Sequence, residues 1–239
     1  MIKIENYTKT YNKDFIAVNN LNLTIADGDI YAFIGHNGAG KTTTIKSIVG
    51  ILDFDKGDIF INGISIVKSP IECKKQIAYI PDNPDLYEHL KGIDYINFIA
   101  DMYDVDKVKR KELIIKYAEM FEIESDLGSE ISSYSHGMKQ KIAIISALVH
   151  EPKVLILDEP FVGLDPVSTH NLKEEMRRLA SLGVTIFFST HVLDVAEKLC
   201  NKIAIIKKGK LVYSGEMQNI TKDKSLEDMF MELEEYENA

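Results

Sequence analysis

The residues best suited to chemistry begin with the segment 35–42, which reads GHNGAGKT. It matches the phosphate-binding pattern G-x-x-x-x-G-K-[ST] at every fixed position. The glycines let the backbone N–H groups curl around an anion, and the start of the following helix adds its positive end. Lys41 can reach the β- and γ-phosphates of a nucleotide, and the hydroxyl of Thr42 can ligate Mg²⁺. The segment therefore predicts a binding site for nucleotide phosphates.

A second group is the pair of acids, Asp158 and Glu159, which follows the apolar run 154–157. Carboxylates at the C-terminal end of a buried strand lie in the crevice where ligands bind in open α/β sheets. Asp158 is placed to hold Mg²⁺, directly or through water, and Glu159 to polarise an attacking water as a general base. An acidic turn after a core strand is the plainer interpretation. The presence of the glycine-rich segment in the same chain favours the functional one.

A third group is the segment 134–141, YSHGMKQK, which precedes an apolar helical pattern at 142–148. Ser135 has the character of an N-cap, Gly137 leaves the backbone bare, and a helix N-terminus favours an anion. Such a start is also common as ordinary helix capping. Its place shortly before the acid pair makes it a candidate for a second phosphate-binding helix start.

The elements that must position these groups alternate between strand and helix. The run 30–34 reads as a buried strand that enters the glycine-rich segment, and 43–49 reads as a helix that leaves it and ends near Gly50. The runs 154–157 and 184–188 suit a parallel sheet that is buried on both faces. The other predicted elements are the strands 2–4, 21–25, 59–61 and 76–81, a hairpin turn at Asn62-Gly63, the helices 93–102, 108–121, 138–148 and 169–181, and a closing hairpin at 203–213.

Composition narrows the classes of function. The net charge of −9 argues against a nucleic-acid-binding surface. Much of the acidity lies from Glu216 onward, where eight acidic residues face two lysines. The spacing of Met229, Phe230 and Leu233 would let part of this tail dock as a helix, but a solvated terminal helix is the interpretation that we favour.

The sequence carries no sign of a membrane span or a metal cluster. Its longest apolar runs are far too short to cross a bilayer, and its first residues lack the apolar core of a signal peptide. We therefore expect a cytoplasmic protein whose action at a membrane would need a partner chain. Cys73 and Cys200 are expected to be reduced thiols. The histidines without metal-ligand spacing, for which we expect structural or surface roles, are His36, His89, His150 and His170.

Five motifs of this chain follow one another in a familiar order: the glycine-rich segment, Ser-His-Gly-Met-Lys-Gln, Leu-Asp-Glu-Pro, Gly163-Leu164-Asp165 and His191. In this respect nearly the whole chain resembles the nucleotide-binding subunits of ATP-binding cassette (ABC) transporters. The resemblance implies an α/β, P-loop NTPase fold with a RecA-like parallel-sheet core, an antiparallel β-lobe and a helical lobe. It implies a single domain over 1–239, with core and β-lobe at about 1–84 and 152–215, the helical lobe at about 85–151 and an acidic tail at 216–239.

The resemblance also assigns roles to single residues. Glu159 would activate water, with His191 and Lys41 stabilising the developing charge at the γ-phosphate. Tyr11 would stack on adenine, although an ordinary core tyrosine is the alternative. The implied ATP-binding residues are Tyr11, Asn37, Gly38, Ala39, Gly40, Lys41, Thr42 and Thr43, and the implied Mg²⁺ contacts are Thr42, Asp158 and Asp82.

Three further residues would act between two subunits. Ser135 and Gly137 match the family's signature motif, which binds the γ-phosphate of ATP held by the other subunit. Asp165 matches a loop that crosses the same interface. The active unit would then be a head-to-tail dimer with two ATP molecules, formed either by two copies of this chain or with a related cassette subunit.

Two positions depart from the family's pattern. His136 adds a side chain where the signature is usually bare glycine, and it is a candidate pH-sensitive group. Asp82 stands where a glutamine usually follows the strand, and it can still offer oxygen to Mg²⁺ although it is shorter and charged. This acid, the Pro-x-Leu-Tyr run at 84–87 and the Ser-x-Gly-Met signature resemble the bacterial exporter branch that handles drugs, peptides or polymers.

The resulting hypothesis is an ATPase subunit at the cytoplasmic face of the cell membrane that powers export through polytopic permease subunits. An importer's energising subunit is one alternative. A soluble cassette ATPase acting on ribosomes or DNA is another, disfavoured by the single cassette and the acidity. A regulatory subunit with feeble turnover is disfavoured by the intact Asp158-Glu159 pair. The substrate is not indicated, because in this family the membrane subunits select it.

Overall fold

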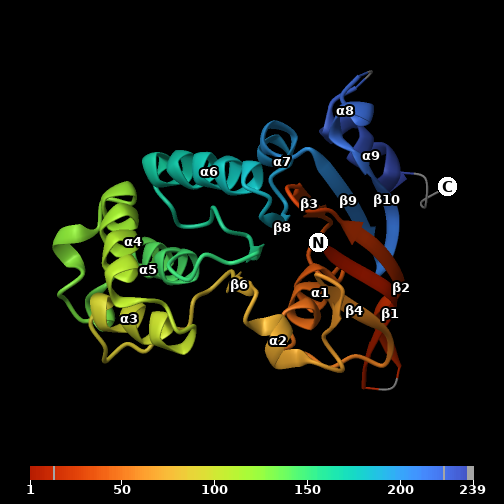
Figure 1. Ribbon diagram of the computed structural model, residues 1–239. Helices are drawn as coiled ribbons and strands as arrows, with labels where there is room; N and C mark the ends of the chain where they lie inside the picture. Colours follow the sequence, from red (N-terminus) through yellow and green to blue (C-terminus); the bar gives the residue numbers. More distant parts are fainter. Residues whose placement is uncertain (13, 223, 236–239) are drawn as a thin grey trace.

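The computed structural model of this chain describes residues 1–12, 14–222 and 224–235, with side chains except those of residues 234 and 235. Two sheets and a set of helices make up these residues (Figure 1). The strands are β1 (Ile2–Tyr11), β2 (Phe15–Ile25), β3 (Ile30–Ile34), β4 (Lys56–Ile61), β5 (Ile64–Ser65), β6 (Ile77–Ile80), β7 (Val154–Asp158), β8 (Thr185–Thr190), β9 (Lys202–Lys207) and β10 (Lys210–Glu216).

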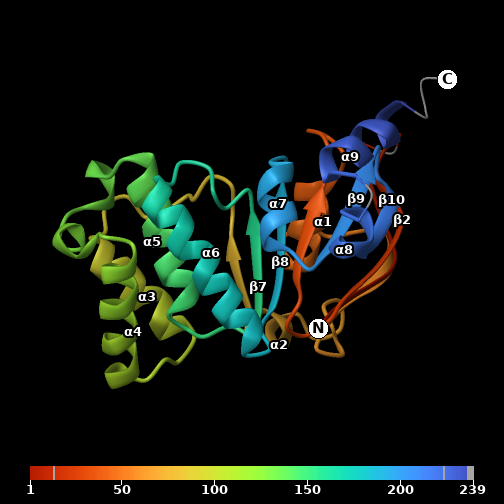
Figure 2. The same ribbon diagram turned by 90° about the horizontal axis from the view of Figure 1, so that it is seen from above.

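The helices form three spatial groups, which Figures 1 and 2 show from two sides. One group flanks the sheets, a second gathers at one end of the molecule, and a third lies beside β9 and β10. The helices are α1 (Lys41–Ile48), α2 (Pro70–Lys74), α3 (Gly92–Met102), α4 (Lys107–Met120), α5 (His136–Leu148), α6 (Pro166–Ser181), α7 (Leu193–Leu199), α8 (Met217–Ile220) and α9 (Leu226–Glu235), with 3₁₀ turns η1 (Glu124–Asp126) and η2 (Ile131–Ser133).

The larger sheet has six strands in the order β10-β9-β3-β8-β7-β6. All of its neighbouring pairs are parallel except β9 and β10, which form the antiparallel closing hairpin that the sequence predicts. Because β3, β6, β7 and β8 run in the same direction, their carboxyl ends share one edge. The segments that leave this edge are the glycine-rich loop, the Asp82 segment, the acid pair and the His191 segment.

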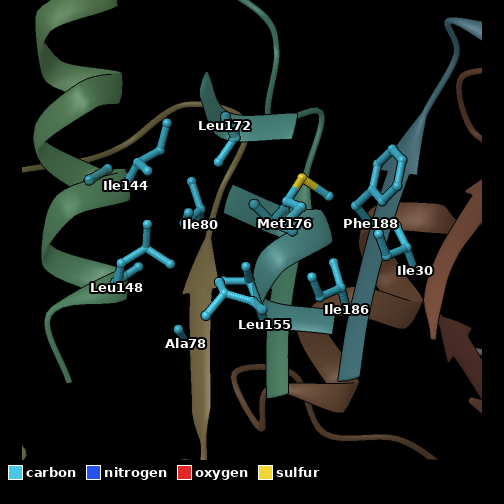
Figure 3. Close-up of a cluster of buried hydrophobic side chains, with 14 of the residues drawn as sticks. Ile30, Ala78, Ile80, Ile144, Leu148, Leu155, Leu172, Met176, Ile186 and Phe188 are labelled. Carbon is cyan, nitrogen blue, oxygen red and sulfur yellow. The ribbon is translucent and has the colours of Figure 1, made fainter. Parts of the chain in front are cut away.

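Side chains of the larger sheet alternate between two cores. Leu155 and Leu157 point into one core with α5 and α6, part of which Figure 3 shows, whereas Val154 and Ile156 point into the other core with α1. This period of two explains why continuous apolar runs form the strands, since both faces are covered by helices or by the second sheet. Each fully buried Leu or Ile side chain of these cores contributes about 1.5–3 kcal/mol.

The smaller sheet is antiparallel and has the order β2-β1-β4-β5. Its β4–β5 turn is the Asn62-Gly63 turn that the sequence predicts, with φ of 50° and 80°, the left-handed pair that a two-residue hairpin requires. The sheet is joined to α1 by a hydrogen bond of 2.9 Å between the hydroxyls of Tyr7 and Ser47. The β-sheet that carries Tyr11 is thereby fixed relative to the glycine-rich loop.

Several helices begin earlier than the hydrophobic pattern predicts. Helix α5 starts at His136 because the Ser135 hydroxyl accepts a hydrogen bond from the Met138 N–H, and α6 starts at Pro166 because Asp165 accepts one from the Ser168 N–H. The short helices α2, α7 and α8 were not predicted, since each has too few residues for a helical period to be recognised.

The C-terminal segment differs from our expectation of a solvated helix. Helix α9 packs against α7, with Leu226 0% and Phe230 8% exposed. Their burial is the reason that the segment folds back, because the opposite face carries Glu227, Asp228 and Glu232. Cys73 and Cys200 are buried free thiols, and burial raises the pKa of both. None of the helices described is both long and apolar enough to cross a membrane.

A buried charge cluster joins α4, which lies at one end of the molecule, to α6. Glu175 of α6 accepts hydrogen bonds from the Tyr117 hydroxyl at 2.9 Å and from Arg178 at 2.7 Å, and Lys116 lies 3.0 Å away. Burial raises the pKa of Glu175, but these three partners outweigh it and leave the pKa below its usual value. The carboxylate therefore stabilises the packing of α4 on α6 in its charged form.

Glu175→Ala should lower the free energy of unfolding by about 1–3 kcal/mol, because the buried Tyr117 hydroxyl loses its acceptor. Lys116 and Arg178 are 39% and 46% exposed, so their charges can be solvated by water. Since the folded pKa is depressed, the stabilisation is present above the unfolded pKa and is lost as pH falls through the folded value. Glu175→Gln should therefore lose less stability than the wild type below about pH 4.5, as measured by thermal unfolding. Glu174→Ala, at an exposed pair with Arg177, should change stability by less than about 0.5 kcal/mol; an equal effect of the two alanine variants would contradict the account.

Candidate active site

The glycine-rich loop connects β3 to α1 and has the shape of an anion cradle. Gly38 and Gly40 have φ of 80° and 109°, the left-handed region that favours glycine. A Cβ at Gly40 would lie 2.8 Å from the carbonyl oxygen of Ala17, so the backbone there cannot carry a side chain. Gly40 is the N-cap of α1 and gives no side-chain hydrogen bond to the helix start. No capping side chain therefore takes up the first N–H groups of α1, which leaves them available to an anion.

The side chain of Lys41 lies within the loop and bonds to the loop's own backbone. It is 7% exposed, and its Nζ donates hydrogen bonds to the carbonyl oxygens of Gly35 at 2.6 Å and of His36 at 3.2 Å. Burial lowers the pKa of Lys41, against the opposing charges of Glu159 and Asp158. The structure thus brings the lysine and the acid pair into one electrostatic environment, as the sequence predicts.

A cavity of about 230 Å³ lies beside this loop and includes Tyr11. Tyr11 is 36% exposed, and across the β1–β2 register it faces Phe15, which is 61% exposed. Two aromatic rings therefore border the cavity, and Phe15 is a residue that the sequence analysis missed. The lining residues are Tyr11, Phe15, Ala17, His36, Asn37, Gly38, Gly40, Lys41, Thr42 and Thr43.

The acid pair leaves the sheet at the end of β7. Asp158 is 3% exposed, and its Oδ1 accepts a hydrogen bond from the Ser189 hydroxyl on the neighbouring strand β8. The N–H of Glu159 in turn lies 3.2 Å from both the hydroxyl and the carbonyl oxygen of Ser189. One serine therefore orients both members of the pair. The sequence signal for it was weak: a Ser-Thr step that ends the apolar run 184–188.

Glu159 and His191 meet across the edge of the sheet. The Nδ1 of His191 lies 2.9 Å from Oε1 of Glu159, whose side chain is 14% exposed. The backbone of Glu159 has φ of 50°, a left-handed conformation that glutamate rarely adopts. Such a conformation persists only where its surroundings enforce it, and it occurs often at functional sites.

Asp82 is placed at the same edge, and in the part of the chain that the structure describes its side chain makes no hydrogen bond or ion pair. It is exposed and follows β6, the strand next to β7. Burial raises the pKa of Tyr79, and the charges of Asp158 and Asp82 raise it further. Both carboxylates therefore lie near one buried phenol.

Ser135 and Gly137 are not brought to the chain's own phosphate loop. They begin α5, outside the set of residues that line the loop's cavity. A Cβ on Gly137 would lie 2.6 Å from the carbonyl oxygen of Gly163, and one on Gly163 would lie 2.4 Å from the His136 ring. The start of α5 thus packs closely against the loop that follows the acid pair, and the φ of 80° at Gly163 is one that favours glycine.

Asp165 is held within its own chain. It caps α6 through Ser168 and lies 2.8 Å from the Nζ of Lys141 on α5. Its pKa is held well below the usual range, first by Lys141 and then by the Ser168 hydrogen bonds. Lys141 is a further residue that sequence reasoning did not single out.

These features belong to a nucleotide-binding ATPase cassette, and comparison with known sequences identifies its family. The sequence profile of the ABC transporter family matches residues 18–162, and the chain belongs to that family. It is the ATP-binding, ATP-hydrolysing subunit of a transporter.

Three curated relatives of Bacillus subtilis are similar to this chain. The ABC-type transporter ATP-binding protein EcsA is 33% identical over 98% of this chain and 96% of its own. The linearmycin resistance ATP-binding protein LnrL is 34% identical over 90% of this chain and 69% of its own. The choline transport ATP-binding protein OpuBA is 36% identical over 97% of this chain and 61% of its own.

Two solved structures share the fold. The ATP-binding subunit of an ABC transporter has a TM-score of 0.93 and 33% identity, and the alignment covers 98% of this chain and 99% of that one. The cassette MJ0796, described as a dimeric post-hydrolysis state bound to ADP and Pi, has a TM-score of 0.83 and 23% identity over 91% of this chain and 99% of that one. The expected α/β, P-loop NTPase fold with a RecA-like core is confirmed.

Ser189→Ala should lower the turnover of ATP by about tenfold to a hundredfold, because Asp158 and Glu159 lose the hydroxyl that orients both. ATP binding should change little, since the phosphate loop is untouched. Steady-state hydrolysis and ATP binding by calorimetry measure the two effects, with Ser181→Ala at the exposed end of α6 as the control. Turnover equal to that of the control would show that the serine does not organise the acid pair.

Proposed function

We propose that this chain works as one half of a head-to-tail dimer that hydrolyses ATP to drive export through polytopic membrane subunits. The observation that supports a dimer is that the expected ATP-site residues lie in two separate places on one chain. The phosphate loop, the acid pair and His191 converge on one edge of the sheet, while Ser135 and Gly137 begin a helix outside that cavity. A second cassette, either another copy or a related chain, would supply the missing phosphate contact. The dimeric state described for MJ0796 supports this arrangement.

In the proposed mechanism, Glu159 is the general base. Its carboxylate accepts the proton of a water that attacks the γ-phosphate, and His191, 2.9 Å from Glu159 Oε1, fixes the carboxylate's orientation. Lys41 and the loop N–H groups, with Asn37 to Thr43 around the phosphates, stabilise the charge that develops there. Tyr11, together with Phe15, forms the aromatic border on which adenine stacks.

The residues near the loop fit Mg²⁺ bound together with a nucleotide. Thr42 is exposed and lines the cavity beside the loop, Asp158 ends β7 at the same edge, and Asp82 offers a further carboxylate oxygen. Among the residues described, no group of three or more His, Cys, Asp or Glu side chains could hold a metal ion. Mg²⁺ in nucleotide sites is typically held by one or two protein groups and the phosphates, so this oxygen donor set suits it. Bound Mg²⁺ would neutralise phosphate charge.

A second cavity, of about 290 Å³, is our candidate for the contact with the membrane subunits. It lies between the end of α1 and α3, and its rim exposes Ile51 and Met102, which are 62% and 63% exposed. Its floor holds the Tyr79 hydroxyl and His150 Nδ1, buried atoms without a hydrogen-bond partner in the described part of the chain. We propose that a cytoplasmic loop of a permease subunit occupies it, because Tyr79 also lies close to Asp82 and so connects the cavity to the site.

Export is favoured over import by the chain's own departures from the family pattern, Asp82 and the Ser-His-Gly-Met signature. The similarity to a linearmycin resistance protein supports that direction, whereas the similarity to a choline transport protein keeps import as the alternative. We place the assembly at the cytoplasmic face of the cell membrane. The transported compound would be selected by the membrane subunits.

The direct test is a pull-down of the tagged full chain from detergent-solubilised native membranes, followed by identification of the partners. A co-purifying polytopic permease supports the proposal. Recovery of an extracellular substrate-binding protein in the same complex would indicate import. Recovery with ribosomes or DNA-processing proteins, without a permease, would contradict the proposal that the partners are permease subunits.

Glu159→Gln should bind ATP but lose turnover by at least about a hundredfold, because the amide cannot take the proton of water. Light scattering on a size-exclusion column should then show an ATP-dependent dimer that persists. Asp194→Asn, at the exposed surface pair with Lys198, is the control and should remain active. Near-normal hydrolysis by Glu159→Gln would remove Glu159 from the role of base.

Met102→Glu should abolish co-purification with the permease, because a charge at the rim of the apolar cavity must be desolvated when the partner binds. ATP hydrolysis by the isolated chain should remain within about twofold, since Met102 is exposed and lies outside the site. The control is Leu182→Glu, an equally exposed apolar residue at the end of α6. Retention of the permease by Met102→Glu, or its loss with Leu182→Glu, would place the contact elsewhere.

A further inference from the structure

The C-terminal helix α9 touches the phosphate loop directly. The ring of Phe230 packs against the ring of His36, the second residue of the loop, with centroids 5.0 Å apart and planes inclined by 60°. Phe230 is 8% exposed although it lies close to the end of the described chain. The contact joins two segments that are almost two hundred residues apart in the sequence.

Phe230 also borders the segment that carries His191. A cavity of about 330 Å³ is lined by Ile34, Gly35, His36, Asn37, His191, Leu193 and Phe230. Phe230 therefore borders the same cavity as the loop that would hold the phosphates and the segment that carries the histidine paired with Glu159. Removing its ring would enlarge this cavity and leave the loop without that wall.

Helix α9 is anchored by contacts that do not involve the loop. Leu226 is fully buried beside α7, and its N–H donates a hydrogen bond of 3.0 Å to Oε2 of Glu197. On the other side, the Nζ of Lys207 donates one of 2.9 Å to the carbonyl oxygen of Leu233. Figure 2 shows α9 lying next to α7 and β9. The helix is thus a fixed support, and Phe230 is the part of it that reaches the loop.

We propose that Phe230 is a positioning residue for ATP, which holds the first half of the phosphate loop in its binding conformation through His36. A loop that is already ordered loses less conformational entropy when a nucleotide binds, so its affinity is higher. The inference rests on the ATP site and is independent of the direction of transport. Through Phe230, the C-terminal segment would raise the affinity for nucleotide, a role that its acidic composition does not indicate.

The test is calorimetric binding of ATP with Mg²⁺ to the full chain. Phe230→Ala should weaken binding by about two- to tenfold, the range expected from losing one aromatic contact. Phe230→Leu keeps an apolar side chain for the core and should show a similar loss, which covers the case in which the alanine variant unfolds. Met231→Ala, the exposed neighbour on α9, should bind like the wild type.

A double-mutant cycle with His36→Ala separates positioning from mere packing. Once His36 is absent, Phe230→Ala should have little further effect, because the two act through one contact. Affinity equal to that of Met231→Ala for both Phe230 variants, or fully additive losses in the cycle, would overturn the proposal. Lys41→Ala serves as the reference: if it binds ATP normally, the phosphate loop itself has been misassigned and the proposed function fails instead.

Discussion

The parallel alignment of β3, β8, β7 and β6 is the constraint on which the rest of this structure depends. It places four chain segments at one edge, each with a different chemical group: the phosphate loop, His191, the acid pair and Asp82. Burial of both faces of the sheet makes that edge rigid, because the strands alternate between two packed cores. The Ser189 hydrogen bonds then tie β8 to the start of the acid pair.

At that edge, opposing electrostatic effects act on the charge of Lys41. Lys41 is buried and pays a desolvation penalty that lowers its pKa, while Asp158 and Glu159 favour its charged form. Glu159 adopts a left-handed backbone and faces His191. Positive loop and negative acids are thus held near one another by the sheet rather than by direct pairing. A nucleotide with its phosphates between them would complete this charge arrangement.

Much of the fold and part of the site follow from sequence patterns with clear physical causes. The buried strands, the Asn62-Gly63 turn and the long helices follow from apolar periodicity and turn chemistry. The phosphate loop follows from its glycines. Ser189 and Phe15 do not, because a serine at a strand end and an aromatic ring in a hairpin have many other uses. The Phe230–His36 contact depends on where α9 docks, which no local pattern specifies.

The close packing of Gly137, Gly163 and His136 connects the signature residues to the loop that follows the acid pair. A Cβ at either glycine would lie within 3 Å of the other segment, so the start of α5 and the loop toward Asp165 are in close contact. The Lys141–Asp165 ion pair adds a second contact between α5 and this loop, and the Glu175 cluster separately joins α4 to α6. The signature residues are therefore packed against the segment that follows the acid pair in the same chain, although we propose that they serve different ATP molecules.

The most direct measurement is cross-linking between two full-length variants, Asn37→Cys and Ser135→Cys, mixed and treated with a short bismaleimide. The native thiols, Cys73 and Cys200, are 0% and 7% exposed and should react slowly. The account predicts a covalent product that joins one chain of each variant and forms only with ATP. Absence of that product, in a mixture where both variants are shown to bind ATP, would contradict a site shared between two chains.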